Sequence, residues 1–346
     1  MSNVESAVKN PVFTSKDLTT DQDIRWCPGC GDYSILKQVQ KVLPEFNLNK
    51  EDIVFVSGIG CSSRFPYYLD TFGMHSIHGR ATSIATGLKA SRPELSVWIV
   101  TGDGDLLSIG GNHFIHMLRR NPDVNVLLFN NEIYGLTKGQ YSPTSGEGTK
   151  TKSTPSGSVD HPFNPLNLAF GSGGTFLART MDRDPKHLQE TLRKAVAHKG
   201  TSLIEIYQNC NIFNDGAFFA FTEKDSKPEE TIFIEEGKPL VFGKERDKGI
   251  KIDGLKARVV SLNDGYSEED LMIHDSGDAD KASLLVRFFD ELQNPDRRPR
   301  PFGVLYQENR ETYDSAIHKQ LDDAQQKKGD GDLDQLLKGS NYWEIS

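Results

Sequence analysis

The sequence predicts an α/β protein with a doubly wound, mostly parallel sheet and a polar C-terminal extension. Up to about residue 220, short apolar runs rich in Val and Ile alternate with amphipathic stretches, a pattern typical of strands joined by crossover helices. The apolar runs are nearly continuous, as expected of strands that are buried on both faces of a parallel sheet. Four strands are predicted on this basis, over residues 52–58, 95–102, 124–131 and 201–208.

The clearest helix is predicted over residues 184–200. Asp184 can cap its N-terminus, Pro185 suits the first turn, and Gly200 can end it. A second helix is expected to open within residues 109–120, "IGGNHFIHMLRR", shortly after a "GDGD" turn. The apolar face of the first helix follows helical spacing and consists of Leu188, Leu192, Ala195 and Val196.

Segment 139–165 is rich in Gly, Ser, Thr and Pro and has no periodicity, so it is predicted to be a long loop. Past residue 222 the composition becomes more charged. Residues 241–262 resemble small hairpins, residues 281–293 a helix, and the chain closes with a polar tail ending in "NYWEIS".

These changes in composition divide the chain into three parts. An N-terminal arm covers residues 1–23, the main domain covers residues 24–222, and the extension covers residues 223–346. Because the extension is polar and has no strand pattern like that of the main domain, we expect it to dock onto a partner or to cover a cofactor site.

The bulk composition excludes several classes of protein. With 346 residues, of which 36% are hydrophobic and 26% charged, the chain has the composition of an ordinary globular protein. The formal net charge of −9 disfavours binding to a nucleic-acid backbone. No apolar run approaches the roughly 18 residues of a membrane span, and "MSNVESAVKNPVFTSKD" lacks the build of a signal peptide. We therefore expect a cytoplasmic protein that binds neither nucleic acid nor a membrane.

Polar turns follow two of the predicted strands. In an open parallel sheet, ligands bind at the edge formed by the carboxyl ends of the strands. A "GDG" turn at residues 102–104 follows one strand, and Asn131 follows the next. The glycines would let a diphosphate approach the backbone, while oxygen atoms of Asp103, Asn131 and the Ile133 carbonyl suit Mg²⁺. Although an isolated Gly-Asp-Gly can be a plain turn, this combination matches the diphosphate-binding motif of thiamine diphosphate enzymes.

The chain has four cysteines, and so few in a long chain are not expected to form a disulfide framework. Cys27 and Cys30 form a C-x₂-C pair, and Cys61 and Cys210 each follow a predicted strand. Four thiolates suit zinc or a 4Fe-4S cluster, whereas a redox-active dithiol or buried thiols are the other interpretations. We favour the cluster because zinc ribbons generally use two C-x₂-C pairs and this chain has one.

A thiamine site beside an iron-sulfur cluster predicts a particular reaction. Thiamine diphosphate acts as an electron sink in the decarboxylation of a 2-oxoacid, and a nearby cluster can take up electrons singly. The two sites together therefore predict an oxidative decarboxylation that delivers electrons of low potential.

The sequence resembles the β subunits of 2-oxoacid:ferredoxin oxidoreductases, and most of all those of the two-subunit 2-oxoglutarate enzymes. The shared motifs are "WCPGCG", "GIGCSSR", "HGRA", "GDGDLLSIGGNH", "NNEIYGLTKGQYSPTS" and the cysteine in "YQNCN", over about residues 24–212. The resemblance implies a main domain of the thiamine diphosphate-binding type, four cysteines that ligate one 4Fe-4S cluster, and Mg²⁺ on Asp103, Asn131 and Ile133. It also implies cofactor contacts by Gly60, Ser62, Ser63, His78, Gly102, Gly104, Asp105, Tyr134, Gly135 and Leu136.

The same resemblance implies partners. Thiamine enzymes need a glutamate from a pyrimidine-binding domain, and one α/β layer with a polar extension leaves no room for that domain. An α subunit would therefore supply the activating glutamate and the coenzyme A site. Ferredoxin would accept the electrons, and the assembly would be a pair of αβ units.

Substrate choice requires a cation for the second carboxylate of a dicarboxylic 2-oxoacid, and Arg64 and Lys138 are the candidates. For each, the alternative is a surface or interface salt bridge. His78 is a candidate for contact with the cofactor or the substrate, or is a structural histidine. The expected reaction converts 2-oxoglutarate to succinyl-CoA and CO₂, reversibly. The alternatives are an enzyme for pyruvate or a broader range of 2-oxoacids and, from another class, a zinc-stabilised scaffold without catalytic activity.

Overall fold

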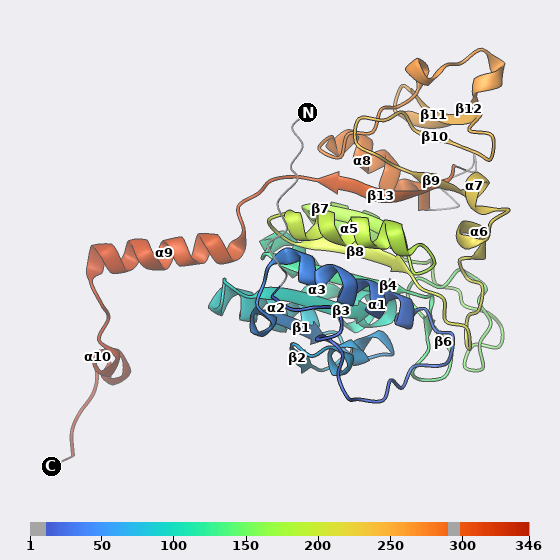
Figure 1. Cartoon of the computed structure of the whole chain (residues 1–346). Helices are drawn as coiled ribbons and strands as arrows, with labels where there is room; N and C mark the ends of the chain where they lie inside the picture. Colours follow the sequence, from blue (N-terminus) through green and yellow to red (C-terminus); the bar gives the residue numbers. More distant parts are fainter. Residues whose placement is uncertain (1–11, 290–297, 346) are drawn as a thin grey trace.

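The fold is built on one eight-stranded sheet, which Figure 1 shows in a computed structural model that describes residues 12–289 and 298–345. The strand order is β2-β1-β3-β4-β8-β7-β13-β9. The six strands from β2 to β7 are parallel, whereas β13 runs antiparallel to β7. This arrangement confirms the predicted α/β class with a mostly parallel sheet. The strands are β1 (Ile53–Ser57), β2 (Phe72–His75), β3 (Ser96–Gly102), β4 (Val124–Asn130), β7 (Phe176–Met181), β8 (Ser202–Tyr207), β9 (Thr231–Phe233) and β13 (Arg300–Gln307).

Helices cover both faces of the sheet because successive strand residues point to opposite sides. Along β1, Val54 and Val56 belong to one hydrophobic core, and Ile53 and Phe55 belong to the other. The first core packs against α2 (Ala81–Ser91), α3 (Gly111–Arg120) and α4 (Pro165–Gly171), and the second against α1 (Asp32–Val42) and α5 (Pro185–Ala197).

Helix α5 is the helix predicted over residues 184–200. The Asp184 carboxylate caps it by accepting a hydrogen bond from the backbone N–H of His187 at 3.2 Å. The helix ends at Ala197 and not at Gly200, because His198 already has an extended backbone (φ −75°, ψ 144°).

His187 gives the fold a pH dependence. Its ring is partly buried between Thr180, which hydrogen-bonds to Nδ1 at 2.8 Å, and the ring of Phe233. Burial lowers the pKa of His187 from 6.5 to about 4. The histidine of the unfolded chain therefore takes up a proton at a pH where the folded one does not. The free energy of unfolding should fall by about 2 kcal/mol from this group as the pH drops from about 7 to 5.

Urea unfolding at both pH values, for the protein and for His187→Gln, measures this contribution. The variant should lose less stability on acidification than the protein does. His116→Gln serves as the control because His116 is exposed on α3. An identical loss in the protein and in His187→Gln would contradict the expectation.

The segment after residue 222 contributes to the same sheet through β9 and β13, which pair in parallel. A small antiparallel sheet lies beyond them, made of β10 (Val241–Phe242), β11 (Lys248–Asp253) and β12 (Lys256–Ser261). The helix predicted over 281–293 lies partly in α8 (Ala279–Leu285), and its residues 290–293 lie outside the described residues. Further short elements include β5 (Ile133–Tyr134), β6 (Gln140–Tyr141), α6 (Phe219–Thr222) and α7 (Lys227–Glu230).

The N-terminal arm is described from residue 12, since residues 1–11 lie outside the described residues. Phe13 and Leu18 of this arm are buried in the core beside α1. Within residues 12–289 and 298–345, no helix is long and apolar enough to cross a membrane.

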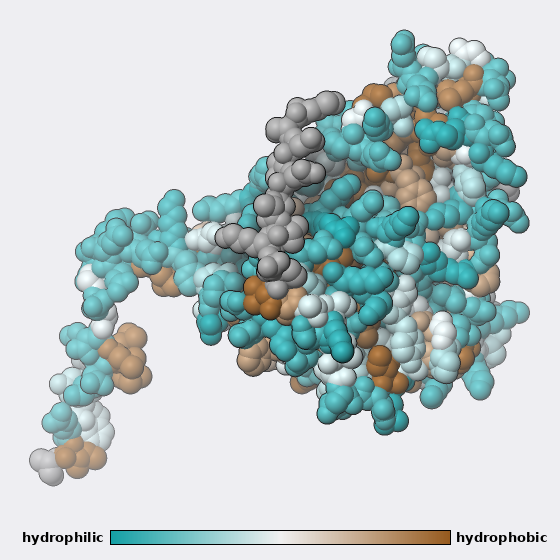
Figure 2. Space-filling view, in the orientation of Figure 1, coloured by the Kyte–Doolittle hydropathy of each residue, from teal (hydrophilic) through white to brown (hydrophobic). Residues whose placement is uncertain are grey.

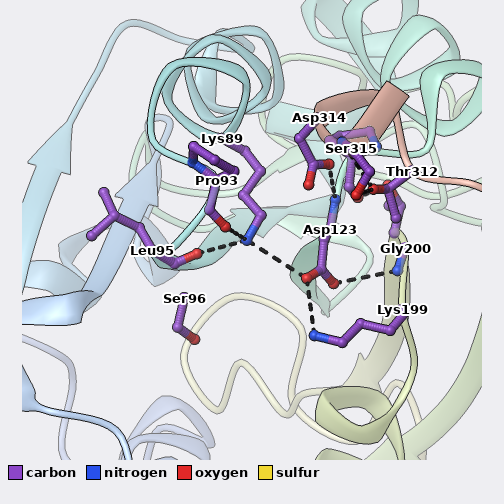
Figure 3. A network of polar contacts seen from close by, with 12 residues as sticks. Lys89, Pro93, Leu95, Ser96, Asp123, Lys199, Gly200, Thr312, Asp314 and Ser315 are labelled. Carbon is purple, nitrogen blue, oxygen red and sulfur yellow. Dashed lines mark hydrogen bonds and ion pairs between the residues drawn. The ribbon is translucent and has the colours of Figure 1, made fainter. Parts of the chain in front are cut away.

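Helix α9 (Tyr313–Lys328) starts at the edge of the sheet where β3 and β4 begin, and α10 (Leu333–Lys338) follows it away from the body (Figure 1). Figure 3 shows the contacts at its base. The Asp314 carboxylate accepts a hydrogen bond from the backbone N–H of Asp123 at 3.0 Å. The Asp123 carboxylate lies 3.6 Å from the Lys89 ammonium, which donates to the carbonyls of Pro93 and Leu95. These contacts fix the base of α9 at the edge opposite to the carboxyl ends of the strands.

Candidate functional site

The loops that follow β1, β2, β3 and β4 enclose a cavity of about 100 Å³ at the carboxyl edge of the sheet. Thirteen of its fifteen lining residues were predicted from the sequence, and only Ile59 and Thr137 were not. Six other predicted residues do not line it: Cys27, Cys30, Ser63, Arg64, Lys138 and Cys210. The predicted residues that line the cavity are Gly60, Cys61, Ser62, His78, Gly102, Asp103, Gly104, Asp105, Asn131, Ile133, Tyr134, Gly135 and Leu136.

Asp103 lies at the base of this cavity and is almost completely buried. Its Oδ2 accepts hydrogen bonds from the hydroxyls of Ser142 at 2.5 Å and Thr144 at 2.6 Å. Burial raises the pKa of the Asp103 carboxyl, and the two hydroxyl donors oppose that shift. Both donors come from the predicted loop 139–165, so this loop folds beneath the site. Sequence reasoning did not assign Ser142 and Thr144, although both lie in the "SPTS" part of a quoted motif.

Asn131 and Ile133 belong to the loop after β4, and both line the cavity beside Asp103. Asn131 donates through Nδ2 to Gln208 Oε1 at 2.8 Å, and its Oδ1 accepts from the backbone N–H of Ile133 at 3.2 Å. Glu132 between them has a positive φ of 55°, which turns the chain sharply. The loop therefore supplies an amide oxygen and a backbone carbonyl near a buried carboxylate, a donor set that suits Mg²⁺.

No group of three or more His, Cys, Asp or Glu side chains in the described ranges is arranged to hold a metal ion. A magnesium site made of one carboxylate, one side-chain amide and one backbone carbonyl is not such a group. A cluster of several iron atoms also spaces its thiolates more widely than a single ion does.

Asp105 ties three loops of the site together. Its Oδ1 accepts hydrogen bonds from the ring of His78 at 2.5 Å and from the backbone N–H of Gly79 at 2.7 Å and Ile59 at 3.0 Å. Its Oδ2 accepts from the Thr101 hydroxyl at 2.8 Å. All four contacts come from protein groups, so Asp105 holds the loops after β1, β2 and β3 in place. With Nδ1 of His78 as donor, the neutral ring has Nε2 as its acceptor.

Gly104 has to be a glycine at this position. A Cβ atom on it would lie 2.2 Å from the ring of Tyr134, whose hydroxyl donates to the Gly104 carbonyl at 3.1 Å. The Tyr134 ring therefore packs directly against the backbone of the "GDG" turn, where a side chain would not fit. The absence of a side chain is also what the predicted close approach of a diphosphate to this backbone requires.

The four cysteines gather beside this cavity, and none of them forms a disulfide. A Cβ on Gly135 would lie 3.5 Å from the sulfur of Cys210 and 3.6 Å from that of Cys61, so both sulfurs flank this glycine. Burial raises the pKa of Cys30, and it raises that of Cys61 to about 12. The charge of Asp32 adds to both shifts, and smaller additions come from Cys210 and Cys61 at Cys30 and from Cys210 and Cys27 at Cys61. Such thiols need a nearby positive charge to ionise, and bound metal ions supply one.

The environment of the cysteines is aromatic and hydrogen-bonded. The indole N–H of Trp26 donates to the Cys61 carbonyl at 2.7 Å, and its ring packs edge-on against Tyr33 and Tyr68. Gln208 donates through Nε2 to the sulfur of Cys30 at 3.2 Å. The residues present thus fit a cluster held by four thiolates, of which Cys27 is exposed and the other three are half-buried.

A second cavity of about 540 Å³ adjoins the first and shares Ile59, Gly60 and Leu136 with it. Arg64 lines this larger cavity from a 3₁₀ helix over Ser62–Tyr68. Lys138 is exposed on the loop after β5 and lines neither cavity. Ser63 is buried, and its carbonyl accepts a hydrogen bond from the Ser57 hydroxyl at 2.7 Å. Of the two cations predicted to bind substrate, Arg64 lines one of these two cavities and Lys138 lines neither.

A buried polar network supports Asp103 from behind. Thr144 donates to Asn130 Oδ1 at 3.0 Å, and Asn130 donates to Glu205 at 2.8 Å. Glu205 also forms an ion pair with Arg179 at 2.7 Å, in which both side chains are completely buried. Arg179 donates in turn to the carbonyl of Pro301 on β13 at 3.1 Å. The network joins β4, β8, β7 and β13 to the loop that contacts Asp103, and no sequence motif indicated it.

Comparisons with known proteins agree with this geometry. Residues 58–206 match the family described as thiamine pyrophosphate enzyme, C-terminal TPP binding domain. The chain is 51% identical to the 2-oxoglutarate oxidoreductase subunit KorB of Mycobacterium tuberculosis over 334 residues, which cover 95% of this chain and 88% of that protein. It is 50% identical to the 2-oxoacid:ferredoxin oxidoreductase 1 subunit beta of Aeropyrum pernix, over 55% of this chain and 60% of that one.

A solved structure is also similar. It is the 2-oxoglutarate:ferredoxin oxidoreductase from Magnetococcus marinus with 2-oxoglutarate, coenzyme A and succinyl-CoA bound. The match has a TM-score of 0.74 and 32% sequence identity, and it covers 94% of each chain.

Proposed function

Since the chain belongs to the β subunits of 2-oxoacid:ferredoxin oxidoreductases, we propose that it acts with an α subunit in the coenzyme A-dependent oxidation of 2-oxoglutarate. The products are succinyl-CoA, CO₂ and a proton, and two electrons leave one at a time for ferredoxin. The reaction is reversible. The observation that carries the proposal is that Cys61 and Asp103 line the same cavity, because one edge of the sheet can then hold both a redox centre and a diphosphate.

Each part of the site has a role in this proposal. Asp103, Asn131 and the carbonyl of Ile133 hold Mg²⁺, and Gly104 leaves room for the diphosphate. Cys27, Cys30, Cys61 and Cys210 hold one 4Fe-4S cluster. When bound, thiamine diphosphate supplies the electron sink for decarboxylation, and the cluster accepts single electrons. His78 contacts the cofactor or the substrate through Nε2, because Nδ1 already donates to Asp105.

The partners follow from what one subunit can provide. The α subunit supplies the glutamate that activates the cofactor and the coenzyme A site, and two αβ units form the assembly. We place the protein in the cytoplasm, where thiols stay reduced.

The last helix supports a role of the extension in docking onto the α subunit. Leu333, Leu336, Leu337 and Trp343 are exposed on α10 and the segment after it. Figure 2 shows hydrophobic residues on the part of the chain that projects from the body. The same extension could alternatively cover the cluster, but α9 leaves the body at the opposite edge of the sheet.

Anaerobic co-expression with the α subunit tests the function directly. The complex should be brown, contain iron and thiamine diphosphate, and reduce a viologen dye with 2-oxoglutarate only when coenzyme A is present. A colourless, zinc-loaded complex without turnover would support the scaffold instead. Equal turnover of pyruvate would support an enzyme for a broader range of 2-oxoacids.

Substrate choice is tested by Arg64→Ala. An arginine can bind the second carboxylate of 2-oxoglutarate, and pyruvate has no such group. The KM for 2-oxoglutarate should therefore rise by about 10- to 100-fold, as expected for the loss of one charged hydrogen-bonding partner, while the KM for pyruvate stays nearly unchanged. Lys138→Ala is the matched control because Lys138 lines neither cavity. Equal effects of Arg64→Ala on both substrates would refute the carboxylate role.

A further inference from the structure

Gln208 lies between the proposed magnesium ligand Asn131 and the cysteine Cys30. None of the roles proposed above includes it. It follows the last residue of β8 and is 1% exposed. Its backbone N–H donates to the Asn130 carbonyl at 2.9 Å, which extends the pairing of β4 and β8 by one residue. This backbone contact fixes the position of the Gln208 Cα, between the loop after β4 and the turn that carries Cys30.

The side-chain amide of Gln208 contacts both Asn131 and Cys30. Its Oε1 accepts from Asn131 Nδ2 at 2.8 Å, and its Nε2 donates to the sulfur of Cys30 at 3.2 Å. Nε2 also donates to the carbonyl of Asn209 at 2.8 Å. A carbonyl can only accept, so the nitrogen of the amide has to be on the side of Asn209 and Cys30.

The orientation of Asn131 is set in the same way. Its Oδ1 accepts from the backbone N–H of Ile133, so its Nδ2 has to face Gln208. Gln208 Oε1 favours the same orientation, because a turned-over Asn131 amide would bring its oxygen against this acceptor and present nitrogen, which cannot bind Mg²⁺, in place of the oxygen ligand. Gln208 thus acts together with the Ile133 N–H to hold the amide of Asn131 in the orientation that presents the oxygen ligand.

We propose that Gln208 is a positioning residue that joins the two cofactor sites, holding Asn131 in its magnesium-binding orientation and donating a hydrogen bond to the Cys30 thiolate. This inference rests on the proposed function, because it presupposes a 4Fe-4S cluster on Cys30 and Mg²⁺ on Asn131. One buried amide then has two measurable effects at two different centres.

The two effects have separate physical causes. Outer partners of metal ligands orient them, and losing such a partner typically lowers metal affinity by about 10- to 100-fold. A hydrogen bond to a cluster thiolate stabilises the reduced state, which carries one more negative charge, and so raises the reduction potential. Removing the amide should therefore weaken Mg²⁺ binding and lower the potential at the same time.

Gln208→Met in the αβ complex tests both effects, because methionine has a similar length and no N–H group. Titration with thiamine diphosphate at varied MgCl₂ should give an affinity for Mg²⁺ that is lower by about 10- to 100-fold. A spectroscopic redox titration should give a lower midpoint potential for the cluster. Gln38→Met is the matched control, since Gln38 is a buried glutamine on α1 that bonds to Ser34 and Gln189, away from both sites.

Gln208→Glu separates the two contacts. A glutamate can still accept from Asn131 but cannot donate to the sulfur when it is ionised. It should keep the Mg²⁺ affinity near that of the unmodified protein and lower the potential. If Gln208→Met does not fold, the test rests on Gln208→Glu, and an unchanged midpoint potential of the cluster in that variant would overturn the proposal.

The remaining outcomes are also decisive. A Met variant that changes only one of the two readouts, or neither, overturns the joint role of Gln208. A change of the same size in Gln38→Met would reduce the effect to general destabilisation and overturns it too. Failure of the proposed function looks different, because the unmodified complex would then contain no cluster or no magnesium-dependent cofactor binding.

Discussion

Asp103→Asn should weaken the magnesium-dependent binding of thiamine diphosphate by about 100-fold or more. Loss of an outer partner alone costs about 10- to 100-fold in metal affinity, and Asp103 is the one charged ligand in the proposed set. The amide has nearly the same shape, so Ser142 and Thr144 keep their contacts by turning their hydroxyls. The change therefore removes charge without emptying the site. Calorimetric titration of the αβ complex with thiamine diphosphate in excess MgCl₂ measures the effect.

Asp160→Asn is the matched control for this prediction. Asp160 lies in the same loop as Ser142, but it is exposed and accepts a hydrogen bond from the hydroxyl of Tyr141 at 2.7 Å. The control should bind the cofactor as the unmodified protein does. If Asp103→Asn also binds it normally, Asp103 does not hold the metal, and the "GDG" turn is a plain turn.

Arg179→Leu should lower the free energy of unfolding by about 3–5 kcal/mol, because it leaves the buried carboxylate of Glu205 without its counter-ion. Both side chains of the pair are 0% exposed, so water cannot replace the lost partner. The thiamine site should suffer as well, since Glu205 connects through Asn130 and Thr144 to Asp103. Urea unfolding of the anaerobically prepared protein measures the loss of stability.

A double variant shows whether the unpaired charge is the cause. Glu205→Gln removes the charge and keeps an oxygen that accepts from Asn130. Adding it to Arg179→Leu should restore part of the lost stability, although each change alone is destabilising. If the double variant loses the sum of the two single losses, the effect comes from packing and not from the buried charge.

The local parts of the fold and the site follow closely from the sequence. The four predicted strands are present as β1, β3, β4 and β8, since each is a continuous apolar run that can be buried on both faces. The "GDG" turn directly follows β3, and Asn131 directly follows β4, because polar residues after a buried strand have to emerge at the edge of the sheet. Residues 300–307 form β13, although "RPFGVLYQ" carries the same apolar pattern and was not assigned to a strand.

The sequence by itself determined the parallel sheet, the edge at which its ligands bind and the residue types gathered there, because each depends on neighbours within one strand and its turn. Only the tertiary structure decided that Gln208 lies between Asn131 and Cys30, that Arg179 neutralises Glu205, and that β13 joins the sheet beside β7. These contacts join residues that lie far apart along the chain. Their geometry is set by how strands pair and how loops pack, and no short stretch of sequence contains that information.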